Sequence, residues 1–253
     1  MSSGDHELIG RIYDLGVVEL NFETYEELSA FSDCKYVSHC GVCMRRLVRR
    51  VESLNLAGDL MWVDPVVWEK GEQRIDRYAW LNVAADVFLI RLVSVHDCLL
   101  LFVSEIYETD LEPRQCTEGQ LKKRGVPNPL LELLRSLRDG HQALRFERNS
   151  RVHQGWERTY SSCDESFKAA ANFERFDRQL KGIDSVGRRI NLNRYMKEGL
   201  VELQRDHNKS LRILSKRLNQ VYDFIQPEFE SRFRTKFRDP EMGFGYSQKL
   251  IKP

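Results

Sequence analysis

Residues Arg77-YAWLNVAADVFLIRLVSVHDCLLLFVSEI-Tyr107 decide the fold class of this chain, and their part from Leu81 to Val103 is its most apolar stretch. A helix of this sequence is apolar on most sides and has only a narrow polar stripe, which includes Asn82 and Asp86. A helix that is apolar nearly all round lies in the middle of a bundle. The interrupting charges, such as Asp86 and Asp97, argue against a membrane span. The stretch therefore predicts a soluble all-α protein with this helix in its core.

The sequence that follows also has helical periodicity. Leucines from Leu130 to Leu144 form one apolar face that runs into the segment 148–153, and a shorter helix is expected over 162–173. From Ile190 onward, apolar residues recur every three or four positions until Pro227, where the proline predicts the end of the helix. Together with 77–107, these elements predict an up-and-down helical bundle of four main helices between residues 75 and 235.

The first 72 residues are less periodic and are expected to form an accessory segment on the bundle. They contain a short helix over 24–31 and a basic helix over 43–53. In the run 61–68, Pro65 argues against both a helix and a central strand, so we expect an extended segment or a loop there. The predicted organisation is an N-terminal accessory segment at 1–72, the helical bundle at 73–239 and a C-terminal tail at 240–253.

The composition is that of an ordinary soluble globular protein, with 253 residues, 42% of them hydrophobic and 30% charged. The polar N-terminal residues show no signal-peptide pattern. Six cysteines without such a signal indicate free thiols in a reducing compartment. We therefore expect a cytoplasmic protein without a membrane partner. Since the net charge is only +1, contact with nucleic acid has to come from local basic clusters.

The segment RNSRVH at 148–153, followed by a glycine, is the strongest candidate site. An arginine neutralises phosphate charge, an amide orients an imidazole and a histidine transfers a proton, which is what RNA cleavage without a metal needs. Asn149 and His153 are four residues apart and share a helix face, whereas Arg148 and His153 diverge by about 140° on a continuous helix. The alternative interpretation is a solvated helix end at which His153 interacts favourably with the helix dipole.

Two other arginine–histidine pairs have a similar spacing. Arg91 with His96 lies in the middle of the apolar helix and has no amide beside the arginine. Arg135 with His141 is divided by the Asp-Gly pair at 139–140. The context of the motif, and not its spacing, therefore favours the segment 148–153.

An arginine followed by asparagine, with a histidine near the end of a bundle helix, resembles the signature of the HEPN family (higher eukaryotes and prokaryotes nucleotide-binding domain). Arg148, Asn149 and His153 match that motif, and the helix layout over 75–235 is similar to the family's. The resemblance implies a homodimer in which two motifs form one endoribonuclease site that needs no catalytic cofactor. It also implies a toxin or antiviral defence protein, with an antitoxin or another defence protein as a partner. Some members have a tyrosine two places after the histidine, where this chain has Gly155.

Cys34, His39, Cys40 and Cys43 form a second candidate site, in the accessory segment. The three-residue step between the last two cysteines is common in zinc sites, and the other two residues would complete four ligands of a structural zinc ion. The alternative interpretation is that the cysteines are ordinary buried residues. His207, on the last predicted helix, is interpreted as a hydrogen-bonded core histidine.

A short basic cluster is the candidate surface for RNA phosphates. Its interpretation as a phosphate-binding helix face competes with that of a solvated face, and no aromatic residue that would stack on bases is interleaved with it. We therefore predict an RNA-cleaving enzyme, with a non-catalytic HEPN-like RNA- or protein-binding module or a zinc-stabilised interaction protein as the alternatives. The candidate RNA-binding residues are Arg45, Arg46, Arg49, Arg50, Arg145 and Arg151.

Overall fold

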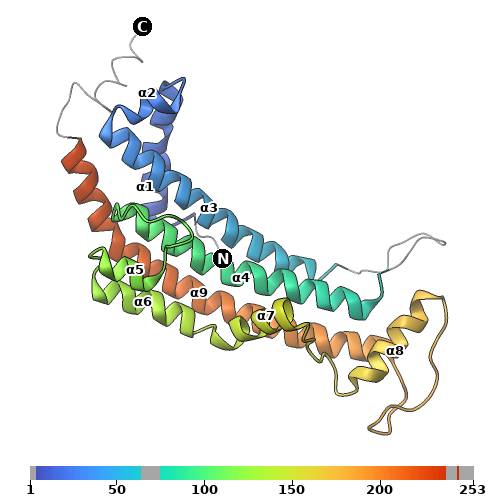
Figure 1. The fold of residues 1–253 in the computed structure, drawn as a ribbon. Helices are drawn as coiled ribbons and strands as arrows, with labels where there is room; N and C mark the ends of the chain where they lie inside the picture. The colour runs from blue at the N-terminus through green and yellow to red at the C-terminus, as the bar shows by residue number, and fades with distance from the viewer. Residues whose placement is uncertain (1–3, 64–74, 238–243, 245–253) are drawn as a thin grey trace. The chain divides into compact units, whose positions relative to one another are not determined.

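The computed structural model describes residues 4–63, 75–237 and 244, and this part of the chain is an all-α helical bundle. The described part contains nine α-helices and one short 3-10 helix. Figure 1 labels the α-helices along the ribbon. Residues 183 and 189 form one isolated antiparallel bridge. The helices are α1 (Glu7–Gly16), η1 (Val17–Asn21), α2 (Tyr25–Ser29), α3 (Ser32–Leu60), α4 (Arg77–Ile106), α5 (Glu118–Lys123), α6 (Asn128–Asp139), α7 (Gln142–Gln154), α8 (Asp164–Arg175) and α9 (Leu192–Lys236).

The chain divides into two compact units, and three long helices contribute to both. Unit 1 consists of residues 1–52, 94–140 and 213–253, and unit 2 of residues 53–93 and 141–212. Helices α3, α4 and α9 each have residues in both units. The predicted boundary at 72 and most of the predicted tail at 240–253 lie outside the described residues, as do residues 64–68 of the expected loop.

Aromatic side chains fill the interior of each unit. In unit 1, the buried ring of Tyr36 stacks on that of Phe229 with 5.6 Å between centroids, and the Tyr36 hydroxyl donates to the Ile106 carbonyl at 3.0 Å. In unit 2, Phe167 packs against Tyr78 and Tyr195 at centroid distances of 5.3 and 5.9 Å. These three tyrosines bury their rings while each hydroxyl keeps a hydrogen bond.

The apolar stretch forms a core helix, as predicted. Helix α4 spans Arg77–Ile106, and its length and composition would be enough to cross a membrane. However, 61% of its most apolar 18-residue stretch is buried inside the protein. This burial is typical of the central helix of a bundle.

Two predicted helix boundaries were wrong. Helix α9 does not end at Pro227 but continues to Lys236, because Ile225, Phe229 and Phe233 keep a buried face at four-residue steps through the proline. Burial of two further phenylalanines offsets the cost of about 3 kcal/mol that an interior proline imposes. The leucine-rich segment is also two helices, because α6 ends at Asp139 with Gly140 as its C-cap and α7 begins at Gln142.

Candidate functional site

The motif 148–153 lies in the last two turns of α7, within unit 2. The helix ends where the sequence predicted, because Gly155 adopts the left-handed conformation with φ of +66°. A glycine takes this conformation without the steric cost that a side chain would add. Its amide donates to the Ser150 carbonyl and closes the helix.

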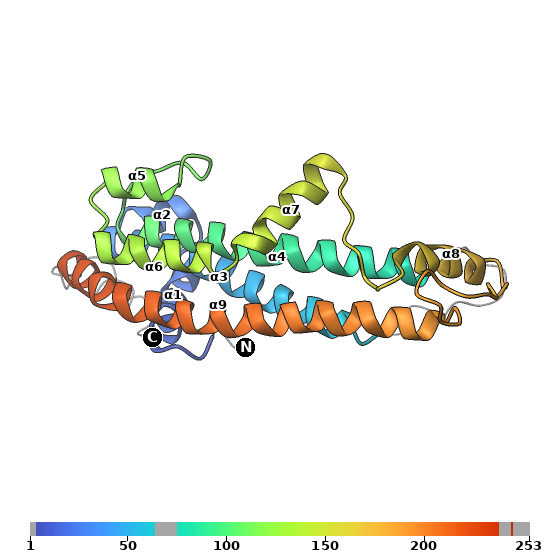
Figure 2. The same ribbon diagram turned by 90° about the horizontal axis from the view of Figure 1, so that it is seen from below.

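One face of α7 is fixed to α4 by a buried arginine. The ribbons of both helices are labelled in Figure 2. The Arg151 side chain is only 6% exposed. Its Nε donates to the Asp86 carboxylate at 2.6 Å, and its Nη2 donates to the carbonyl and the side-chain oxygen of Asn82, both at 3.1 Å. The Tyr160 hydroxyl donates to the same Asn82 side-chain oxygen at 3.1 Å. These bonds fix the rotation of α7 about its axis and therefore determine which face it exposes.

A second buried arginine, Arg158, connects α7 to α9. Arg158 forms ion pairs with Glu147 of α7 at 3.7 Å and with Glu202 of α9 at 3.3 Å, and it also donates to Asp206. Burial raises the pKa of Glu147, and the nearby positive charges of Arg158 and Arg151 offset part of that shift. Arg158 is thus surrounded by three carboxylates, and these contacts join the face of α7 that carries Glu147 to α9.

The opposite face of α7 carries two of the three predicted catalytic residues. Asn149 and His153 are exposed and lie one helical turn apart on this face. Arg148 is half-buried and starts from another side of the helix, as predicted for a continuous helix. However, its Nη1 donates to the Asn149 side-chain oxygen at 2.8 Å, which brings the guanidinium charge to the face of His153. Phe146, which is 72% exposed, lies on the same face.

The two rival pairs have buried histidines in structural contacts. His96 is 7% exposed and lies 3.5 Å from a carboxylate oxygen of Glu118. His141 is 6% exposed, and its Nε2 lies 3.3 Å from the Ser210 carbonyl oxygen. Of the three arginine–histidine pairs, only the one at 148–153 presents its histidine to solvent.

The candidate RNA-binding arginines are distributed over two helices. Those at 45, 46, 49 and 50 lie on α3 in unit 1, and those at 145 and 151 lie on α7 in unit 2. Arg46 and Arg49 are exposed, whereas Arg45 is half-buried and forms an ion pair with Glu19 at 3.4 Å. An RNA contact by Arg151 would require its bonds to α4 to break.

The four candidate zinc ligands all lie on α3. Burial raises the pKa of Cys43 to about 11 and that of Cys34 to about 12, and it raises the pKa of Cys40 well above its usual value. His39 is hydrogen-bonded to the Tyr25 hydroxyl at 2.6 Å and faces Glu105 at 3.6 Å. Within the described ranges, no group of three or more suitable side chains is placed to hold a metal ion. The zinc site stays a prediction, which a measurement of bound zinc would test.

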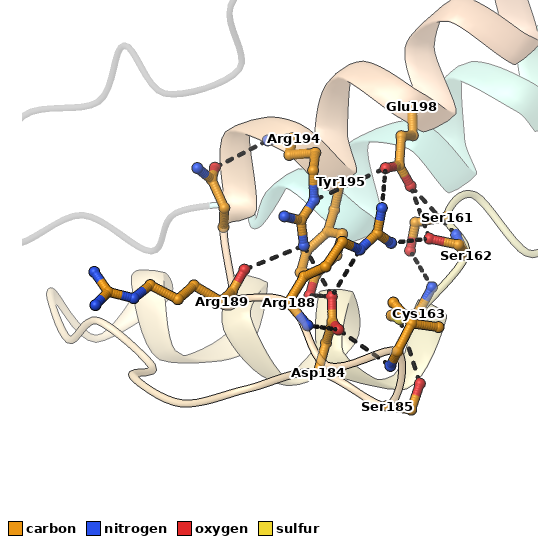
Figure 3. A network of polar contacts seen from close by, with 12 residues as sticks. Ser161, Ser162, Cys163, Asp184, Ser185, Arg188, Arg189, Arg194, Tyr195 and Glu198 are labelled. Carbon is orange, nitrogen blue, oxygen red and sulfur yellow. Dashed lines mark hydrogen bonds and ion pairs between the residues drawn. The ribbon is translucent and has the colours of Figure 1, made fainter.

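A buried carboxylate that was not expected from the sequence holds the loop before α9 (Figure 3). Asp184 accepts hydrogen bonds from the amides of Val186 and Arg188, at 3.1 and 2.8 Å. It also accepts from the Tyr195 hydroxyl at 2.9 Å and from Arg194 Nη2 at 2.8 Å. The local signal was an aspartate three residues before a glycine, since Gly187 has φ of +77° and aspartate favours such turns.

Asparagine in place of Asp184 should lower the melting temperature at pH 7. Burial alone would raise the pKa of Asp184, but the hydrogen bonds from the Arg188 amide, the Tyr195 hydroxyl and the Val186 amide hold it below its usual value. A lowered pKa stabilises the folded state above the unfolded pKa of about 4, and this contribution is lost as the pH falls through the folded pKa. The melting temperatures of the wild-type protein and of the Asp184→Asn variant should therefore converge in acid. Glu165→Gln, at a highly exposed carboxylate, is the control and should change little.

Comparisons of the chain with family models, with curated proteins and with solved structures gave no match. A function is therefore inferred from the residues of this chain and their geometry.

Proposed function

We propose that this chain is a metal-independent endoribonuclease of the HEPN type that acts as a homodimer in the cytoplasm. The observation that carries the proposal is the exposed face of α7, where the Arg148 guanidinium is hydrogen-bonded to Asn149 and His153 lies one turn further on. An arginine, an amide and a solvent-accessible imidazole are together suited to chemistry at a phosphodiester.

In the proposed reaction, the 2′-oxygen of RNA attacks the adjacent phosphorus and the bond from phosphorus to the 5′-oxygen breaks. One His153 removes the proton of the 2′-hydroxyl, and a second His153 protonates the departing 5′-oxygen. Arg148 neutralises the negative charge that develops on the phosphorane, and Asn149 holds the guanidinium in place. The products are a 2′,3′-cyclic phosphate and a 5′-hydroxyl end.

Two features support the assembly of two chains. Separate acid and base groups need two histidines, whereas the motif of one chain supplies one. The exposed surface of α7 also carries large apolar side chains, with Phe146 72% and Val152 54% exposed. We propose that the second chain covers these side chains and removes their apolar surface from water. From the resemblance of the motif to the HEPN signature, we also propose a toxin or antiviral defence role, with an antitoxin or a defence protein as partner.

The purified chain should cut single-stranded RNA in the presence of a chelator and should leave DNA of the same sequence intact. DNA lacks the 2′-hydroxyl that acts as the nucleophile, and no step of the proposed chemistry needs a metal ion. The measurement is product analysis on a gel, together with detection of the cyclic phosphate end.

Gln154→Ala, an exposed change at the end of α7, is the matched control and should cut normally. Activity that disappears with chelator, or equal cutting of DNA, would contradict this mechanism. Binding of RNA without any cutting would favour a non-catalytic RNA-binding module.

A further inference from the structure

Helices α1 and α3 enclose a groove within unit 1 that the sequence did not reveal. The groove has a volume of about 310 Å³. Gly10 and Tyr13 line it from α1, and Arg45, Val48 and Arg49 line it from α3. The basic cluster of α3 is thus accompanied by an aromatic ring, which comes from a helix about 30 residues earlier in the chain.

One of the residues that line the groove is a glycine with open space beside it. Gly10 lies inside α1, where glycine is less favourable than alanine. A Cβ atom at this position would meet no atom within 4 Å, so packing does not require a glycine here. Tyr13 lies three residues further along the same helix face and is 60% exposed. The open space at Gly10, near an exposed ring, leaves room for a flat group to stack on that ring.

The charges around the groove fit one nucleotide. Arg45 and Arg49 are one turn apart on α3 and both line the groove, and the Arg45 guanidinium forms an ion pair with Glu19. Arginines of this kind pair with phosphate oxygens. Glu52 also lines the groove, and its carboxylate is an acceptor for the amino group of a base.

We propose that this groove binds an unpaired base of single-stranded RNA, with Tyr13 as the stacking platform and Arg49 and Arg45 as contacts to the flanking phosphates. Sequence-tolerant binding of single strands combines a basic surface with an aromatic side chain in this way. The choice of RNA as the ligand rests on the proposed function, whereas the groove itself lies on other helices than the motif. The groove restricts the substrate to RNA with unpaired nucleotides.

The test measures binding separately from cleavage. His153→Ala in the full chain serves as the parent, and its affinity for a fluorescent single-stranded oligoribonucleotide is measured by anisotropy. Tyr13→Ala should weaken binding about tenfold, as expected for the loss of one stacked base, whereas Tyr13→Phe should stay within about twofold. Arg49→Gln should lower the slope of affinity against salt by about one.

A second variant excludes loss of binding through unfolding. Gly10→Leu places a side chain into the open space at this lining position of the groove, and it should weaken binding about as much as Tyr13→Ala. Its melting temperature should not fall, because leucine is a better helix former than glycine. Tyr25→Ala removes another exposed tyrosine of unit 1 that does not line the groove, and it should bind like the parent.

The outcomes distinguish the groove from the catalytic motif. Unchanged affinity in both Tyr13→Ala and Gly10→Leu overturns the groove even if the wild-type chain cuts RNA. Weakened affinity in both variants supports the groove even if the wild-type chain cuts nothing, in which case the proposed function fails. Equal affinity for fully paired RNA, with the same loss in Tyr13→Ala, also overturns the proposal, because a paired base is not free to stack there.

Discussion

Replacing Gly58 by alanine should lower the free energy of unfolding by about 3 kcal/mol, although alanine is the better helix former. A Cβ at Gly58 would lie 2.3 Å from Cε1 and 2.7 Å from Nε2 of His207. The imidazole has little freedom to move away, because its Nε2 lies 3.0 Å from the Leu54 carbonyl oxygen and its ring packs edge-on against Phe88. The cost is therefore at the upper end of the range for overpacking.

A double-mutant cycle isolates this clash. His207→Ala removes the ring, so Gly58→Ala should cost little or nothing on that background, and the two changes should be strongly non-additive. Denaturant unfolding of the four proteins gives the coupling energy. Gly10→Ala, whose Cβ meets no atom within 4 Å, is the control and should be neutral or stabilising. If Gly58→Ala lowers the free energy of unfolding equally in the wild-type protein and in the His207→Ala variant, another contact is responsible.

The sequence predicted the fold class and the main helices because apolar periodicity reports burial directly. The 77–107 stretch is α4, the short helix at 24–31 is α2 with Thr24 as its cap, and His207 is the predicted hydrogen-bonded core histidine. Helix α3 was missed as one long element, since its periodicity is weak outside 43–53. The continuation of α9 through Pro227 was also missed, because tertiary burial overrides the local effect of proline.

Only part of the candidate site was accessible from the sequence. Local spacing correctly placed Asn149 and His153 on one helix face, with Arg148 starting from another side. The anchoring role of Arg151 was not predicted, because Asp86 lies 65 residues away in the chain. The pairing of Arg158 with Asp206, 48 residues apart, was missed for the same reason. Such contacts depend on helix packing, which the spacing of residues does not report.

His153→Ala should reduce RNA cleavage at least about a hundredfold while leaving the melting temperature unchanged. General acid–base catalysis contributes about 10² to 10⁴ in rate, and this variant removes the proposed proton-transfer group. The imidazole is exposed at the end of α7, and its loss breaks none of the bonds that Arg151 makes to α4. Cleavage and thermal unfolding measured on one preparation separate these effects, with Gln154→Ala as the matched exposed control.

Mixing experiments extend this prediction to the assembly. If two motifs share one site, a mixed dimer of wild-type and His153→Ala chains lacks either the acid or the base. The amount of wild-type chain is held fixed, and the chains are left to exchange subunits. An excess of His153→Ala chains should then depress cleavage towards zero, whereas an excess of Gln154→Ala chains should not. Cleavage that stays constant, or a strictly monomeric chain that still cuts RNA, would contradict the shared site. A dimer with the exposed faces of α7 on opposite outer surfaces would contradict it as well, because two histidines must reach the same phosphodiester.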